Sequence, residues 1–154
     1  MDQIDHAILR QLQADGRLKI TELAERVGLS PTPCARRVAA LEKSGVIRGY
    51  IAVVDQSQMG LPISAFISIE LKEQSSDLIE SFEAAVESFE EVMDCWLMTG
   101  SQDYLIRAVA ADLQAYERFL QNKLTRVEGI ARMRTRFALK RAVRRAALPN
   151  VQSG

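Results

Sequence analysis

The chain has 154 residues, 47% hydrophobic and 26% charged, a composition that suits a soluble protein with a buried core. Its apolar runs are too short to span a bilayer, and its start lacks the basic and apolar regions of a signal peptide, so we expect a cytoplasmic protein with no membrane partner. Cys34 and Cys95 give neither a disulfide framework nor metal-ligand spacing, and we expect both to be buried.

The charges balance over the whole chain but not along it. Residues 1–50 carry 8 basic and 6 acidic side chains, residues 51–129 carry 5 and 14, and residues 130–154 carry 7 and none. Such asymmetry is typical of a nucleic-acid-binding part joined to a part with another role. The acidic middle would repel DNA, so any DNA binding has to be local.

The first fifty residues predict three short helices. In the first, apolar residues recur every four positions from Ile4 to Leu12, and we expect Gly16 to form its left-handed C-terminal cap. We expect Thr21 to cap the second helix, which ends at Gly28.

The third helix is predicted to begin after Ser30, its N-cap, with Pro31 at the first helical position. Pro33 also falls in the first turn, where backbone N–H groups have no helical partner, so it need not break the helix. We expect this helix to end near residues 43–44, before Gly45. The turn before it covers only residues 28–30, and so short a Gly-containing connection between amphipathic helices indicates a helix-turn-helix.

The predicted third helix has two different faces. At 100° per residue, Cys34, Val38 and Leu41 form one stripe, which we assign to the packed side. The opposite face would meet the major groove of DNA; it carries Thr32, Arg36, Ala40 and Lys43.

The two arginines of this helix are predicted to have different roles. Arg36 can fork onto a guanine edge, whereas Arg37, on the flank, better suits a phosphate. The alternative is that both belong to a solvated helix face. Our candidate DNA-binding residues are Ser30, Thr32, Pro33, Arg36, Arg37 and Lys43.

The rest of the chain predicts a second domain. Residues 46–54 are rich in strand-forming residues, and residues 51–62 form a connector that we interpret as a linker or hinge strand. From Ile63 to about residue 140 the pattern reads strand, helix, strand, strand, helix, strand, which is the ferredoxin-like βαββαβ unit. The expected domains are 1–50, 63–145 and a C-terminal tail of residues 146–154. One sheet face would carry both helices, and the other would need a partner, most simply a second subunit.

An enzymatic function finds little support in the sequence. The only histidine, His6, lies in the first predicted helix, and no nucleophile elbow, phosphate loop or dinucleotide fingerprint is present. We therefore expect a protein that is not an enzyme and has no cofactor or metal. Two alternative functions remain. One is a stand-alone ligand-binding module, which would give residues 1–50 no role, and the other is an architectural protein that wraps DNA.

Three blocks of the sequence resemble one family of regulators. They are the helix-turn-helix run of residues 21–47, the block Met98-Thr99-Gly100-x-x-Asp103-Tyr104-Leu105, and the closing Phe137-Ala138-Leu139-Lys140. Together with the first helix they resemble the Lrp/AsnC (feast/famine) family of transcriptional regulators over about residues 2–145.

This resemblance implies an α+β protein in which a winged helix-turn-helix precedes a ferredoxin-like effector domain. It implies sequence-specific binding to double-stranded DNA and a dimer that assembles to a tetramer or octamer. It also implies a small-molecule effector, an amino acid or related metabolite, and control of amino-acid metabolism or transport genes.

The resemblance also implies an effector loop at Gly100, Ser101, Gln102, Asp103 and Tyr104. Physically, Gly100 lets backbone approach a ligand, and the carboxylate of Asp103 suits an α-amino group. The alternative is a plain hairpin turn whose residues serve the turn geometry.

In the family the last strand helps to line the effector pocket, and here it presents Thr135 and Arg136. Thr135 fits the family pattern of small hydroxyl residues, but Arg136 does not. Three readings stay open: Arg136 contacts an acidic effector, it blocks the pocket, or it pairs with acidic residues such as Glu70 or those of another subunit together with Arg132 and Arg134. The basic tail from Lys140 to Arg145 either contacts DNA or stays solvated.

Overall fold

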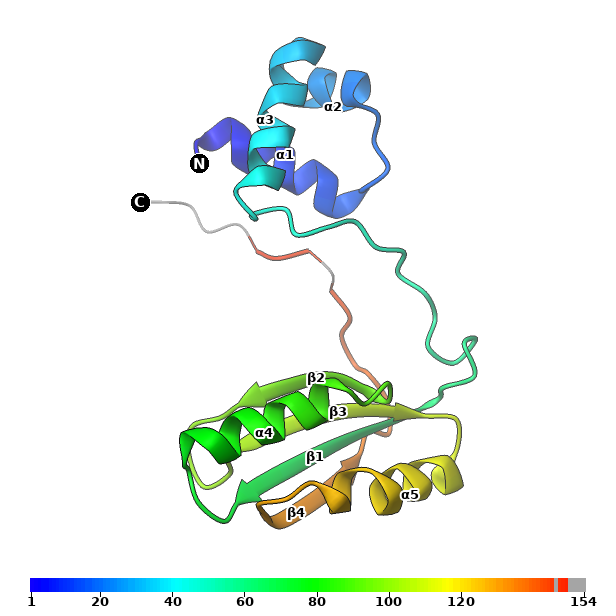
Figure 1. Cartoon of the computed structure of the whole chain (residues 1–154). Helices are drawn as coiled ribbons and strands as arrows, with labels where there is room; N and C mark the ends of the chain where they lie inside the picture. The colour runs from blue at the N-terminus through cyan, green and yellow to red at the C-terminus, as the bar shows by residue number, and fades with distance from the viewer. Residues whose placement is uncertain (146, 150–154) are drawn as a thin grey trace. The chain divides into compact units, whose positions relative to one another are not determined.

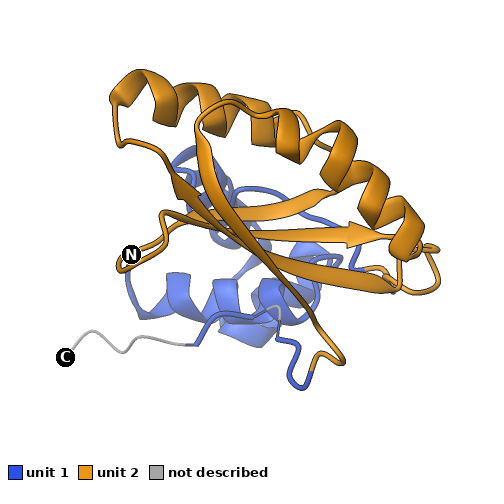
Figure 2. Ribbon diagram, turned by 90° about the horizontal axis from the view of Figure 1, so that it is seen from below, with its two compact units in different colours: residues 1–53, 142–154 blue, residues 54–141 orange. Residues whose placement is uncertain are grey.

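The computed structural model describes residues 1–145 and 147–149; the rest of the predicted C-terminal tail lies outside the described residues. The chain divides into two compact units (Figure 2). Unit 1 consists of residues 1–53 and the described residues from 142 onward, and unit 2 of residues 54–141. The division falls within the connector at residues 51–62.

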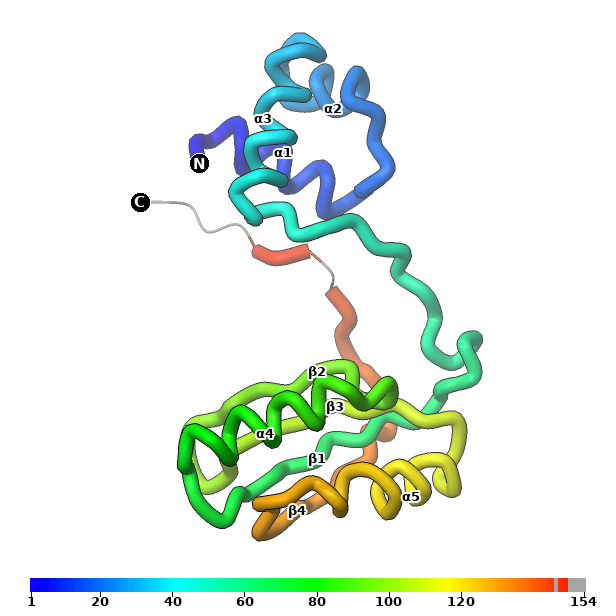
Figure 3. Tube along the Cα trace, viewed as in Figure 1, coloured from blue at the N-terminus to red at the C-terminus, as the bar shows by residue number. Residues whose placement is uncertain are grey.

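The described residues of unit 1 form three helices, α1 (Gln3–Ala14), α2 (Ile20–Val27) and α3 (Pro31–Lys43) (Figure 3). Each is short and amphipathic, so its stability comes from burying its apolar stripe against the other two. The small shared core has these fully or largely buried side chains: Ile8, Leu23, Ala24, Cys34, Val38 and Leu41. The stripe that the sequence predicts for α3 is therefore confirmed as its packed side.

Two of the predicted helix ends are wrong. Helix α1 ends at Ala14 with Asp15 extended, and Gly16 does not have a positive φ. A side chain on Gly16 would lie 3.3 Å from the ring of Tyr50, so close packing and not a left-handed cap explains this glycine. Helix α2 begins one residue before Thr21, with Lys19 as its N-cap and no side-chain cap. The apolar Ile20, packed against the core, extends that helix backwards.

The turn between α2 and α3 agrees with the sequence. Gly28 is left-handed, with φ of 70°, and its N–H donates to the last carbonyls of α2. Ser30 occupies the N-cap position of α3 in an extended conformation, although its side chain makes no capping hydrogen bond, and Pro31 starts the helix.

The strand character expected between residues 46 and 62 is absent from this described segment, which contains only turns and irregular backbone. A strand requires a hydrogen-bonded neighbour, and the only sheet among the described residues contains β1–β4 of unit 2. Strand-forming residues without a partner do not make a strand, so the hinge strand was a wrong prediction.

Unit 2 is a four-stranded antiparallel sheet in the order β2-β3-β1-β4 with two helices on one face (Figure 1). Its chain order is the predicted βαββαβ: β1 (Ile63–Leu71), α4 (Ser76–Glu87), β2 (Val92–Leu97), β3 (Tyr104–Ala110), α5 (Leu113–Asn122), a 3-10 turn η1 (Leu124–Arg126) and β4 (Ile130–Phe137). Helix α5 ends at Asn122, before the 3-10 turn.

The core of unit 2 lies between the sheet and the helices. Alternate residues of β1 are buried there with Phe82 and Val86 of α4 and Phe119 of α5; they are Ala65, Ile67, Ile69 and Leu71. The intervening residues of β1 therefore face the other side of the sheet.

The open face of the sheet mixes apolar and charged side chains. Cross-strand pairing places Phe66 beside Arg107 and Arg136, and Ser68 beside Leu105 and Arg134. Trp96, 44% exposed, pairs with Leu105 on the same face. This face therefore carries both aromatic and basic side chains.

Candidate DNA-reading helix and effector cavity

The exposed face of α3 is the one that the sequence predicts for DNA. Because Cys34, Val38 and Leu41 are buried in the unit 1 core, the opposite side of the helix faces solvent. All four residues assigned to that side are exposed: Thr32, Arg36, Ala40 and Lys43. Ser30, also exposed, lies at the helix N-terminus, whereas Pro33 is half-buried.

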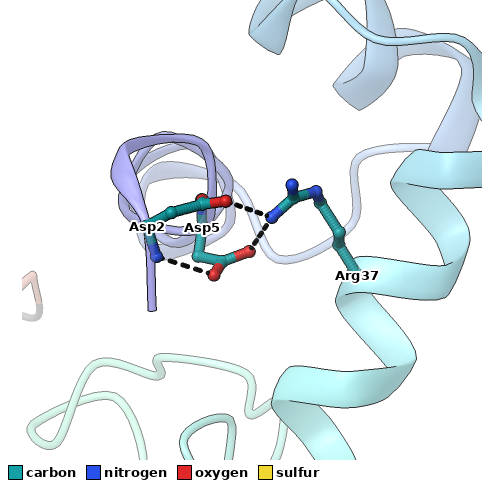
Figure 4. Close-up of polar contacts among 3 residues, drawn as sticks. All are labelled: Asp2, Asp5 and Arg37. Atoms are coloured by element: carbon teal, nitrogen blue, oxygen red, sulfur yellow. Dashed lines mark hydrogen bonds and ion pairs between the residues drawn. The ribbon is translucent and has the colours of Figure 1, made fainter.

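The two arginines of α3 differ in their partners. Arg36 is exposed and makes no hydrogen bond or ion pair with the described residues, so its guanidinium is available to a ligand. Arg37 is 32% exposed, and its Nη1 donates to Asp2 Oδ2 and to Asp5 Oδ1, each at 2.8 Å (Figure 4). The other terminal nitrogen of the guanidinium points away from both aspartates.

The two aspartates are themselves fixed by the start of α1. The N–H of Asp5 donates to Asp2 Oδ1, and the N–H of Asp2 donates to Asp5 Oδ2, each at 2.9 Å, which makes a reciprocal capping box. The Asp5 hydrogen bond, and then that of Arg37, hold the pKa of Asp2 below its usual value. The carboxylates of Asp5 and Asp2 raise the pKa of Arg37 in turn.

Sequence reasoning missed this triad, although part of it was visible. An acidic residue three positions after an Asp, just before an apolar run, is a capping-box signal. What the pattern does not show is the contact across 32 residues from Asp5 to Arg37, which depends on how α1 packs against α3.

In unit 2, the predicted effector loop is held by its own aspartate. Asp103 Oδ2 accepts from the N–H of Leu71 and Oδ1 from Nε2 of Gln74, both at 2.7 Å. The N–H of Asp103 also donates to the carbonyl of Ile69. Gly100, with φ of 112°, allows the turn. The carboxylate expected to meet an α-amino group is therefore occupied in anchoring the loop to β1.

Tyr104 is a core residue. Its ring lies against Phe82, with centroids 4.7 Å apart, and its hydroxyl donates to Glu83 at 2.6 Å. Burial, and then Glu83, raise the pKa of Tyr104. Within the predicted loop, Ser101 and Gln102 are left as the side chains that meet open space.

A cavity of about 250 Å³ lies where this loop meets the open face of the sheet. Residues of β1, the loop and β4 line it: Ser68, Ile69, Glu70, Ser101, Gln102, Arg132, Met133 and Arg134. The structure thus brings two of the predicted loop residues together with β4, as the family resemblance implies, but through arginines that were not among the candidates.

The two candidates on β4 do not line this cavity. Thr135 faces the helices, where its hydroxyl lies 2.5 Å from that of Tyr116. Arg136 is exposed on the open face beside Phe66, without a partner among the described residues. The expected pairing with Glu70 is made by Arg132, at a long 3.6 Å.

Cys34 is buried as expected, but Cys95 is exposed, so that prediction is wrong. Cys95 lies on β2, an edge strand of the sheet. Desolvation, and then Glu83, raise the pKa of its thiol to about 11, which argues against a reactive thiolate.

Two family models match this chain. Residues 1–48 match the model for winged helix-turn-helix DNA-binding domains, and residues 64–148 match that for the Lrp/AsnC ligand-binding domain. The chain belongs to the Lrp/AsnC family. It is thus a DNA-binding transcription regulator and not an enzyme.

Individual relatives cover nearly the whole chain. The Bkd operon transcriptional regulator of Pseudomonas aeruginosa is 44% identical over 97% of this chain and 97% of its own length. The leucine-responsive regulatory protein of Escherichia coli K12 is 41% identical over 88% of this chain and 82% of its own. A Neisseria meningitidis regulator solved with L-Met has 37% identity and a TM-score of 0.90, covering 97% of this chain and 96% of its own.

Among the described residues, no three His, Cys, Asp or Glu side chains are grouped so that they could hold a metal ion. No described helix has both the length and the apolar character that crossing a membrane requires.

Proposed function

We propose that this Lrp/AsnC regulator reads its operator with the exposed face of α3 and is controlled by a small metabolite bound at the Ser101–Gln102 cavity. The observation that carries the first half is the contrast between the buried stripe of α3 and the free guanidinium of Arg36 on its opposite face. In a helix-turn-helix this face enters the major groove.

In this proposal the residues of α3 divide into base readers and backbone contacts. Arg36 forks onto a guanine, with Thr32 beside it, and each such bidentate contact contributes about 1–3 kcal/mol of discrimination. Ser30 and Pro33 at the helix start, and Lys43 at its end, lie against the DNA backbone. Arg37 grips a phosphate with the guanidinium edge that its aspartates leave free.

We further propose that the protein is a homodimer that joins through the region of Phe66 and Trp96 on the open sheet face, leaving the cavity at the Ser101–Gln102 loop open to a ligand, and assembles to tetramers or octamers. That face exposes Trp96 and half-buries Phe66, a surface that a second copy would cover. A dimer would present two α3 helices to half-sites roughly 34 Å apart.

The effector is proposed to be an amino acid or a related metabolite. Relatives are named for leucine and for the Bkd operon, and one regulator was solved with L-Met, which favours amino-acid metabolism as the regulated process. A ligand can shift the regulator only by binding one of its states better than another. We place this ligand against Gly100, Ser101 and Gln102, with Asp103 and Tyr104 as the supports of the loop.

Operator selection followed by fluorescence anisotropy tests the function. At one fixed salt concentration, a specific regulator binds the selected site at least about 1000-fold more tightly than random DNA. Arg36→Gln should lose most of that ratio, and Arg10→Gln, an exposed arginine of α1, should keep it. Equal binding to both DNAs, with a steep salt dependence, would instead identify an architectural DNA-wrapping protein.

A further inference from the structure

The cavity beside the effector loop has polar side chains on every wall. Ile69 is fully buried in the core on the helix-covered side, and Met133 packs against the same core, so both offer backbone to the cavity. The side chains that reach it are those of two serines, one glutamine, one glutamate and two arginines: Ser68, Ser101, Gln102, Glu70, Arg132 and Arg134. The lining is mainly polar, so an aliphatic ligand side chain would find little apolar surface there.

The charges of these walls do not cancel. Glu70 and Arg132 lie 3.6 Å apart with both side chains well exposed, a weak contact that a ligand can replace. Arg134 makes no hydrogen bond or ion pair with the described residues. One carboxylate and two guanidiniums leave the cavity with a net charge of +1 at neutral pH.

We propose that the cavity binds an acidic α-amino acid, a dicarboxylate that carries one ammonium group and a net charge of −1. This rests on the proposed effector function and names the class of its ligand. Arg134 receives one carboxylate through its planar fork, which matches carboxylate geometry, and Arg132 receives the second. Glu70 accepts the ammonium group. Ser101 and Gln102 close the site from the loop that Asp103 anchors.

Glu70 should distinguish an acidic amino acid from the 2-oxo dicarboxylate that lacks its ammonium group. A 2-oxo dicarboxylate has the same two carboxylates, but its carbonyl would face Glu70 without a positive charge to offer. The carboxylate of Glu70 would then lie beside the ligand without a cationic partner, which costs binding free energy. The amino acid should therefore bind more tightly than the oxo acid.

Calorimetric titration of the full-length protein tests the class. We expect L-glutamate or L-aspartate to bind at least about tenfold more tightly than L-leucine, L-methionine or 2-oxoglutarate, a difference of 1.4 kcal/mol or more. Arg134→Gln should weaken the acidic ligand at least about tenfold, and Arg134→Lys should weaken it less because the charge remains. Arg118→Gln, an exposed arginine of α5, is the matched control and should leave binding unchanged.

Glu70→Gln distinguishes the two dicarboxylates. It should weaken the amino acid and leave 2-oxoglutarate unchanged or improved. Circular dichroism of each variant shows whether it is folded. If Arg134→Gln does not fold, the binding of the acidic ligand to Arg134→Lys tests the role of Arg134 instead.

The outcomes separate the two proposals. Tighter binding of leucine or methionine, insensitive to Arg134→Gln, would overturn the acidic class and leave the effector function standing. If no compound binds while operator binding is intact, the effector function itself fails.

Discussion

The two units each present arginines on an exposed surface, and they manage them differently. On α3, Arg37 is held at 2.8 Å by two aspartates that a capping box fixes, while Arg36 is free. On β4, Arg132 has one loose contact at 3.6 Å, and Arg134 is free. In our proposals Arg36 binds DNA and Arg134 binds a small dicarboxylate with an unpaired guanidinium group. Arg37 offers a DNA phosphate only the guanidinium edge that its aspartates leave free.

The strongest test of this contrast is at Arg36. We expect Arg36→Gln to weaken operator binding roughly 5- to 150-fold and to relax the preference at one base pair, because a bidentate base contact is worth about 1–3 kcal/mol. Anisotropy against a set of single-base operator variants measures both effects. An unchanged base preference would show that Arg36 is a solvated surface residue and does not contact a base.

The next effect should appear in the loop that supports the cavity. Asp103→Ala leaves the N–H of Leu71 and the amide of Gln74 without their acceptor. Leaving the partly buried N–H of Leu71 without an acceptor costs about 1–3 kcal/mol, so we expect a lower unfolding midpoint for unit 2. Urea unfolding followed by Trp96 fluorescence measures it. Equal stability, with effector binding lost, would show that Asp103 contacts the ligand directly.

A smaller effect separates the two roles of Arg37. If its free edge grips a phosphate, Arg37→Gln lowers the slope of log affinity against log salt by about 1 without changing the base preference. The same variant leaves Asp2 and Asp5 facing each other, so the thermal midpoint of unit 1 should fall. A lower midpoint with an unchanged salt slope would show that Arg37 only links α1 to α3 and does not contact a phosphate.

The smallest effect is the pH dependence of this triad. The folded pKa of Asp2 lies below its ordinary value of 3.8, so its charge stabilises the fold above that pH and loses this effect as the pH falls through the folded pKa. Asparagine still caps a helix. The stability difference between wild type and Asp2→Asn should therefore be present at pH 6 and vanish toward pH 2 in thermal melts. A difference independent of pH would exclude the charge of Asp2 as its source.

The sequence predicted the elements whose patterns are local. The strand alternation from Ile63 and the Gly28–Pro31 turn are confirmed because each residue's environment follows from its immediate neighbours. The capping role of Thr21 and the hinge strand failed because packing of Ile20, or a missing strand partner, decided them. The same holds for the sites. The exposed face of α3 follows from helical spacing. The hydrogen bonds that anchor Asp103 and Arg37 instead join residues about thirty positions apart in the sequence, which a local pattern does not show.

The central claim is that an anion at Arg134 controls DNA reading by α3, and one measurement tests it directly. Operator affinity is titrated with and without saturating L-glutamate and L-aspartate, for wild type and for Arg134→Gln at the same salt concentration. We expect the acidic amino acid to change the affinity of the wild type at least about fivefold, the lower end of typical coupling free energies, and to leave the variant unchanged. The same shift in both proteins, or no shift in the wild type, would contradict the account.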